Sequence, residues 1–123
     1  MIRRLLLAAG LACPAPAAIA GEAVIAFTVP GQSFSVNTAV EAEARAEGDS
    51  WQVFGRLPEN LHAAFADMTA MHAGKTMALS VCGKQLNRPT LRTRIENGVF
   101  AITGLSEADA ERVAAQLNRG RCD

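Results

Sequence analysis

The stretch from residue 74 to residue 104 constrains the fold most strongly. It contains three short apolar runs, at residues 77–81, 91–95 and 99–103, and glycine, proline and Asn-Gly residues separate them. These separators are typical of turns and sheet edges rather than of strand interiors. In the first run apolar and small residues alternate, as in a strand with one buried face. The stretch therefore predicts an antiparallel meander of three strands.

Helical patterns lie on both sides of this stretch. Residues 58–73 start at Pro58, whose missing N–H costs nothing in a first turn, and Gly74 follows them. Residues 106–119 start with Ser106, with Asp109 three residues later as in a capping box, and Gly120 ends them. We expect an α+β fold in which both helices pack on one face of the antiparallel β-sheet. The expected core comprises Phe65, Met68, Leu79, Val81, Ile102, Val113 and Leu117.

The part of the chain before residue 58 carries weaker signals. Residues 24–29 and 51–57 have the composition of strands, and residues 34–36 are consistent with a short one. Residues 39–46 are ambiguous, because alanine and glutamate favour a helix whereas their alternation favours an edge strand. The order of the strands in this part does not follow from the sequence.

The first twenty residues have the pattern of a secretory signal peptide. A basic start with Arg3 and Arg4 precedes a short apolar run, and Ala18 and Ala20 form a small-residue cleavage site. We expect residues 1–20 to be removed and residues 21–123 to form a single domain that is periplasmic or secreted. A lipoprotein signal with Cys13 as the lipidated residue is the alternative, although Gly10 stands where a larger aliphatic residue is usual.

The remaining chain limits the class of partner. No later apolar stretch is long enough to span a bilayer, so a soluble mature protein without a transmembrane segment is expected. With Arg3 and Arg4 removed, the 12 basic residues fall to 10 against 12 acidic ones, a formal charge of −2. This balance gives no electrostatic reason to expect nucleic acid as a partner.

Two cysteines, Cys82 and Cys122, remain after loss of the signal peptide. An even pair in an exported chain predicts a disulfide. Free thiols or a metal pair are the alternatives, but neither cysteine lies in a CxxC motif and His62 and His72 have no ligand spacing relative to them. Strict alternation counts against the disulfide, since it places Cys82 on the face opposite Leu79 and Val81.

An ordered set of residues runs from Trp51 to the end of the chain. It comprises Phe65, Thr69, Gly74, Lys75, Met77, Ala78, Leu79, Gly83, Lys84, Pro89, Leu91, Ile95, Gly98, Ile102, Thr103, Gly104, Ser106, Glu107, Ala108, Asp109, Ala110, Leu117 and Gly120. In kind and order this set resembles the head subdomain of the first periplasmic domain of SecD, a subunit of the bacterial Sec translocon. The resemblance covers roughly seventy residues and extends more loosely upstream to about Phe34.

The chain departs from the SecD pattern in three places. Cys82 replaces the usual acidic residue before the hairpin glycine, and the double glycines around the last strand become Asn97-Gly98 and Gly104-Leu105. The transmembrane helices, on which the SecD family depends to draw preproteins across the membrane with the proton gradient, are absent. The resemblance therefore implies a stand-alone head module whose partners are unfolded or translocating polypeptide or Sec components.

A group of basic residues is the candidate binding site: Lys84, Arg88, Arg92 and Arg94 lie around the predicted hairpin and the strand after it. They could form a peptide-binding edge that takes up extended polypeptide by strand addition. Alternatively, they protect an edge strand against aggregation.

Catalytic and cofactor sites are not indicated. No Ser-His-Asp set, paired carboxylates, metal motif or phosphate-binding loop can be assembled from the spacing, so we expect neither an enzyme nor a cofactor. The leading hypothesis is a non-catalytic polypeptide-binding module in protein export or envelope protein handling. A small secreted structural or inhibitory protein that reuses the fold is the alternative. Thiol chemistry at Cys82 would require that cysteine to be free.

Overall fold

A computed structural model describes residues 23–122. The predicted signal peptide at residues 1–20, the alternative lipidation at Cys13 and the expected start of the mature chain at Gly21 lie outside the described residues. They remain predictions.

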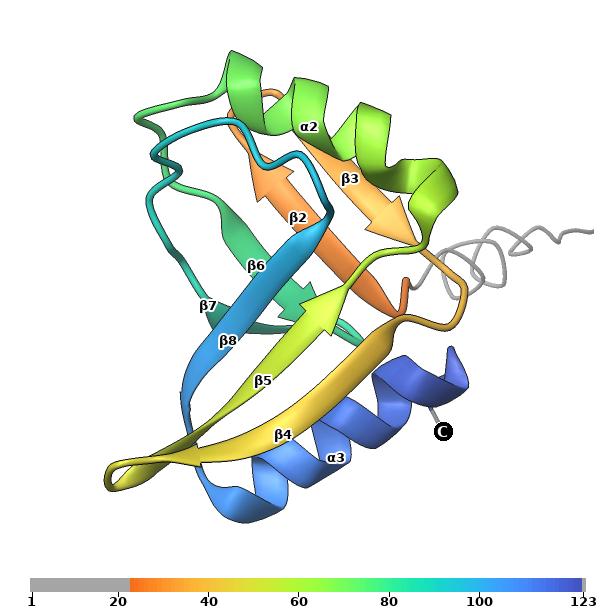
Figure 1. The fold of residues 1–123 in the computed structure, drawn as a ribbon, viewed down its shortest axis with the longest axis vertical. Coiled ribbons are helices and arrows are strands. Elements are labelled where there is room, and N and C mark those ends of the chain that lie inside the picture. Colours follow the sequence, from red (N-terminus) through yellow and green to blue (C-terminus); the bar gives the residue numbers. More distant parts are fainter. Residues whose placement is uncertain (1–22, 123) are drawn as a thin grey trace, which may run out of the picture.

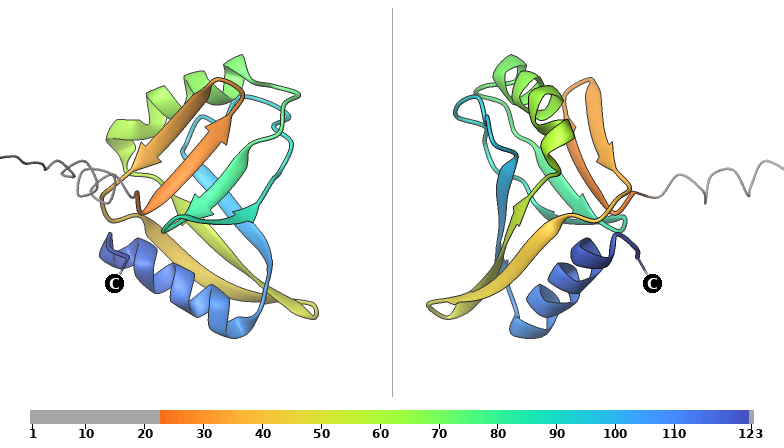
Figure 2. Two further views of the ribbon diagram at one scale, coloured as in Figure 1. Left: turned by 180° about the vertical axis from the view of Figure 1, so that it is seen from behind. Right: turned by 45° about the vertical axis from the view of Figure 1, so that its right-hand side comes forward.

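The first sheet is four-stranded and antiparallel, with the order β3–β2–β6–β7. Its strands are β2 (Ile25–Val29), β3 (Gln32–Val36), β6 (Ala78–Val81) and β7 (Lys84–Asn87). The inner strand β2 pairs with β3 on one side and with β6 on the other, so residues far apart in the sequence lie side by side. The four-stranded sheet lies behind the other elements in Figure 1 and in front in the left view of Figure 2.

The second sheet is three-stranded and antiparallel, with the order β4–β5–β8. Its strands are β4 (Glu41–Glu47), β5 (Ser50–Arg56) and β8 (Val99–Leu105). The ambiguous residues 39–46 therefore contribute to a strand. Ala42 and Ala44 pack against the core while the intervening acidic and basic residues face outward, because alternate side chains of a strand lie on opposite faces.

Two helices lie at opposite ends of the space between the sheets (Figure 1). A short 3₁₀ turn, η2 (Glu59–Leu61), leads into α2 (His62–Met71), and α3 (Glu107–Arg119) lies along β4 and β5. Both helices agree with the predicted ranges. The capping prediction is also confirmed, since the Asp109 N–H donates to the Ser106 hydroxyl oxygen at 3.1 Å and Gly120 ends α3 in the left-handed conformation.

The α+β class with antiparallel pairing is confirmed, but the predicted meander is wrong. Residues 91–95 form no strand, and the strands are divided between two sheets. After the β6–β7 hairpin the chain crosses to the three-stranded sheet, where β8 pairs with β5. Alternation of apolar residues determines which face of a strand is buried but not which strand it pairs with, and this is why the pattern misled.

The core lies between the two sheets and is centred on Phe27 of β2. The Phe27 ring lies 4.8 Å from the ring of Phe65 on α2, 5.5 Å from that of Phe100 on β8 and 6.3 Å from that of Phe34 on β3, all in edge-to-face orientation. One side chain thus joins both sheets and a helix. All seven predicted core residues are buried: Phe65, Met68, Leu79, Val81, Ile102, Val113 and Leu117.

The structure joins Cys82 and Cys122 in a disulfide with a Cα–Cα distance of 5.5 Å, within the usual range. Cys82 does not lie within a strand. With Gly83 it forms the two-residue turn between β6 and β7, and both residues have positive φ, 50° and 82°, as in a type I′ turn. The alternation argument against the bond therefore does not apply. The bond ties the end of α3 to the four-stranded sheet.

We predict that reducing this disulfide lowers the free energy of unfolding by about 4 kcal/mol, because a closed loop of roughly forty residues restricts the unfolded chain. Urea unfolding with and without reductant measures the difference. The variant Cys122→Ala is the control and should match the reduced protein and be insensitive to reductant. Equal unfolding midpoints of oxidised and reduced wild-type protein would contradict the prediction.

Candidate polypeptide-binding site

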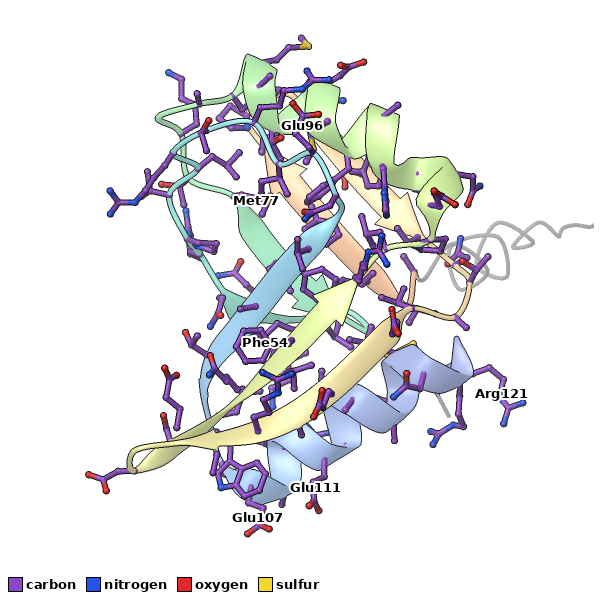
Figure 3. All side chains as sticks on the ribbon, viewed as in Figure 1. Phe54, Met77, Glu96, Glu107, Glu111 and Arg121 are labelled. Atoms are coloured by element: carbon purple, nitrogen blue, oxygen red, sulfur yellow. A yellow bond between two sulfur atoms is a disulfide. The ribbon has the colours of Figure 1, made fainter. Side chains whose placement is uncertain are left out.

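An apolar pocket of about 280 Å³ lies between one edge of β8 and the segment of residues 89–95. Its floor is built by Met77 and Leu79, which belong to β6 and its lead-in; Met77 is labelled in Figure 3. The segment contributes residues 89–93 and Ile95, and β8 contributes residues 99–101. The volume is near the lower end of the range for ligand pockets, which fits one or two apolar side chains rather than a large cofactor.

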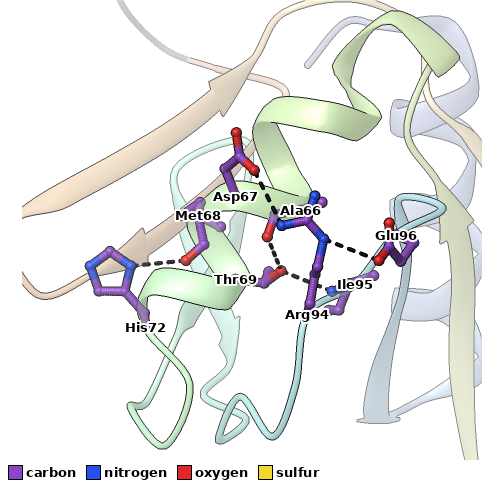
Figure 4. A network of polar contacts seen from close by, with 8 residues as sticks. All are labelled: Ala66, Asp67, Met68, Thr69, His72, Arg94, Ile95 and Glu96. Atoms are coloured by element: carbon purple, nitrogen blue, oxygen red, sulfur yellow. Dashed lines mark hydrogen bonds and ion pairs between the residues drawn. The ribbon is translucent and has the colours of Figure 1, made fainter.

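A buried threonine holds one end of the segment. Thr69 on α2 is completely buried, and its hydroxyl donates to the Ala66 carbonyl at 3.0 Å and accepts from the Ile95 N–H at 2.9 Å (Figure 4). Both hydrogen-bonding functions of the hydroxyl are therefore satisfied, as burial requires. This contact explains how a polar residue stands in the apolar stripe of α2.

Main-chain hydrogen bonds hold the other end of the segment. The Leu91 N–H donates to the Lys75 carbonyl at 2.8 Å, the Gly74 N–H donates to the Leu91 carbonyl at 2.7 Å, and the Met77 N–H donates to the Pro89 carbonyl at 2.8 Å. The Leu91 side chain is buried, and these bonds hold the segment that forms the wall of the pocket. They replace the strand that the sequence predicted at residues 91–95.

An asparagine side chain joins β7 to β8 beyond the residues that line the pocket. The Thr103 N–H on β8 donates to Asn87 Oδ1 at 2.7 Å, and Asn87 Nδ2 donates to the Thr103 carbonyl at 3.1 Å. The amide of Asn87, at the end of β7, thus bonds to β8 in the way that the main chain of a neighbouring strand would. It joins the two sheets at this point.

The four basic residues predicted to form one edge are spread over the surface. Arg94 is ion-paired with Asp67 at 3.2 Å and with Glu96 at 3.1 Å (Figure 4). Arg92 lines the apolar pocket, while Arg88 lines a separate hollow beside β2.

Lys84 lies near the start of α3, at a distance from the apolar pocket. The pKa of Asp109 is lowered by the hydrogen bond and charge of Arg112 and, to a smaller extent, by the charge of Lys84. Of the four predicted residues, the structure therefore places Arg92 alone in the pocket lining.

The outer face of the three-stranded sheet carries a second aromatic surface. The Arg45 guanidinium lies 4.6 Å from the centroid of the Phe54 ring, and it is ion-paired with Glu43 at 3.0 Å (Phe54 is labelled in Figure 3). The hydrogen bond and charge of Arg45 lower the pKa of Glu43. Because Arg45 already contacts the Phe54 ring and is ion-paired with Glu43, this face is a poorer candidate for a polypeptide-binding site than the apolar pocket.

The two histidines have separate structural roles. A ring nitrogen of His62 lies 2.8 Å from the Leu57 carbonyl oxygen, and one of His72 lies 2.9 Å from the Met68 carbonyl oxygen at the end of α2. Within residues 23–122, no group of three or more His, Cys, Asp or Glu side chains is placed to hold a metal ion. No helix in the same range is long and apolar enough to cross a membrane.

We predict that Thr69→Val loosens the pocket wall, because valine keeps the shape of threonine but cannot accept the Ile95 N–H. The free energy of unfolding should fall by about 1–2 kcal/mol, the cost of an unmade hydrogen bond in a buried position. Hydrogen exchange at the Ile95 amide should become faster.

Thr93→Val is the matched control for this variant, since Thr93 is exposed in the same segment. It should change neither stability nor exchange at Ile95. Unchanged exchange at Ile95 in the Thr69→Val protein would show that the bond does not hold the segment.

A family profile, a curated relative and solved structures all relate this chain to SecD or SecDF. The profile of the family described as "SecDF, P1 head subdomain" matches residues 21–122. A curated relative, the protein translocase subunit SecD of Thermobaculum terrenum (strain ATCC BAA-798 / CCMEE 7001 / YNP1), is 36% identical over 56 residues. The match covers 46% of this chain and 11% of that SecD, so the chain corresponds to a small part of this relative.

Two solved structures share the fold. One, described as "Structure and function of a membrane component SecDF that enhances protein export", has a TM-score of 0.60 at 24% identity, and the match covers 68% of this chain and 39% of that one. The other, "Crystal structure of SecDF in Super-membrane-facing form", has a TM-score of 0.57 at 24% identity, and the match covers 69% of this chain and 12% of that one.

Proposed function

The chain belongs to the SecDF P1 head subdomain family, and we propose that it is a non-catalytic polypeptide-binding module that acts in protein export outside the cytoplasm. The observation that carries this proposal is the apolar pocket between the edge of β8 and residues 89–95. One structural neighbour is a SecDF described as a membrane component that enhances protein export. The export role of this chain is proposed from that kinship.

The chemistry of the pocket fits a polypeptide in transit. A chain that is not yet folded exposes the apolar side chains that folding later buries, and an apolar pocket removes them from water. A pocket of about 280 Å³ takes up only one or two such side chains. We therefore expect weak and reversible binding with little dependence on sequence, as a module that must release its substrate requires.

We predict that Val99→Ser weakens binding of an unfolded polypeptide about five-fold, because Val99 lines the pocket and part of its apolar surface would be lost. Reduced, carboxymethylated lactalbumin, which stays unfolded, is a suitable probe, and fluorescence anisotropy gives the affinity. Met71→Ser is the matched control. Met71 is 75% exposed and Val99 40%, but Met71 lies outside the pocket lining.

Met71→Ser should leave the affinity unchanged if the pocket is the binding site. An equal loss in both variants would indicate unspecific adhesion to exposed apolar surface. Absence of binding by the wild-type domain would overturn the proposed function.

A further inference from the structure

The edge of β8 that faces the pocket carries main-chain groups without a partner strand. Asn118 bonds to both main-chain groups of Ala42 on β4, at 3.0 and 2.9 Å, so these groups point away from β5. Ala42 lies opposite Gly55, so this is a pair without main-chain hydrogen bonds between β4 and β5. The N–H and C=O of Gly55 therefore point the other way, toward Phe100 on β8. Phe100 and Ile102 therefore bond to β5.

The intervening residues of β8 consequently direct their N–H and C=O groups to the opposite edge. The contacts of Thr103 confirm this direction independently, because the Asn87 side chain binds both the N–H and the C=O of Thr103 from that edge. Val99 and Ala101 alternate along β8 with Phe100 and Ile102, so their N–H and C=O groups point to the same edge as those of Thr103. Within residues 23–122, no hydrogen bond to the N–H or C=O of Ala101 is present on this edge.

The opposite wall of the pocket has a similar main-chain group. Thr90 forms an isolated antiparallel bridge with Thr76, and the bonds of this bridge are made by the flanking residues Pro89 and Leu91. The N–H and C=O of Thr90 therefore point away from Thr76, and Thr90 is one of the residues that line the pocket. β8 and the segment of residues 89–95 thus each line the apolar pocket with a residue, Ala101 or Thr90, whose main-chain groups have no partner strand on that side.

We propose that the polypeptide binds by adding an extended strand to the free edge of β8, paired with the main chain of Ala101 and with alternate apolar side chains in the pocket. This inference rests on the proposed function and specifies its binding mode. The Asn87 amide shows that the edge accepts a peptide-like group, and it ends the added strand by occupying Thr103. Main-chain pairing supplies affinity without sequence specificity, as in other cases of β-strand addition.

Charge defines the preferred partner further. Arg92 lines the pocket, and within the described residues no ion pair involves its guanidinium. The preferred segment accordingly has apolar side chains at alternate positions and an acidic residue beside them. A rim charge of this kind contributes more to the rate of association than to affinity.

An N-methyl scan of a synthetic peptide tests the inference. The probe is a fluorescein-labelled peptide in which valine alternates with threonine and glutamate flanks each end. Methylation of a main-chain nitrogen removes one donor and keeps the side chain. Peptide affinity should fall at least ten-fold when the methyl group is on a nitrogen that faces β8, and should change less than two-fold when it is on one of the alternate nitrogens. The loss of affinity on N-methylation should therefore recur at every second residue of the peptide.

A pair of protein variants provides the second measurement. Ala101→Pro removes the free-edge N–H but leaves the bonds of Phe100 and Ile102 to β5, and proline is tolerated at such edge positions. It should reduce peptide affinity about ten-fold, whereas Ala101→Val, which keeps the N–H, should reduce it less than three-fold. Urea unfolding verifies that both variants are folded.

The outcomes separate the inference from the proposed function. Equal tolerance of N-methylation at all positions, with Val99→Ser still weakening binding, would overturn strand addition and leave pocket binding intact. No binding of either the peptide or the unfolded protein would overturn the proposed function itself. Loss of affinity on N-methylation at every second residue, together with weaker peptide binding by Ala101→Pro, supports strand addition.

Discussion

Edge-to-face packing of Phe27 with Phe65 and Phe100 is the interaction on which the rest of the structure depends. Each sheet has one apolar face, which must be covered by another element to be stable in water. The Phe27 ring brings the four-stranded sheet, the three-stranded sheet and α2 into one core. Gly55 belongs to the same arrangement, because a Cβ at this position would overlap the Phe100 ring.

This shared core brings the sheets together face to face, but their edges meet only in part. Asn87 joins β7 to β8 at Thr103, and the disulfide joins the end of α3 to the β6–β7 turn. Further along β8 the chain of residues 88–98 turns away to reach α2, where Thr69 holds Ile95. The gap that remains is the apolar pocket, so the proposed binding site follows from how the two sheets share one core.

The sequence predicted the helices, the buried residues and the cysteine pair, because caps, helical periodicity and cysteine parity are local signals. It did not predict the division into two sheets. Residues 91–95 have the composition of a strand, but Leu91 pairs with Lys75 and Ile95 is bound by a threonine side chain. Charge directed attention to Lys84 and Arg94, whereas the candidate site depends on the main chain of Ala101, which no side-chain pattern reveals. Thr69 was the available signal, as a polar residue in an apolar stripe.

Hydrogen exchange at the Ala101 amide, with and without a bound peptide, tests the open edge of β8 most directly. In the free domain this amide should exchange rapidly, while the neighbouring Ile102 amide, bonded to β5, should exchange slowly. Saturation with the alternating valine–threonine peptide should slow exchange at Ala101 strongly and leave Ile102 as it was. A slow Ala101 amide in the free domain, or one whose exchange the bound peptide does not change, would contradict the open edge and the binding mode proposed for it.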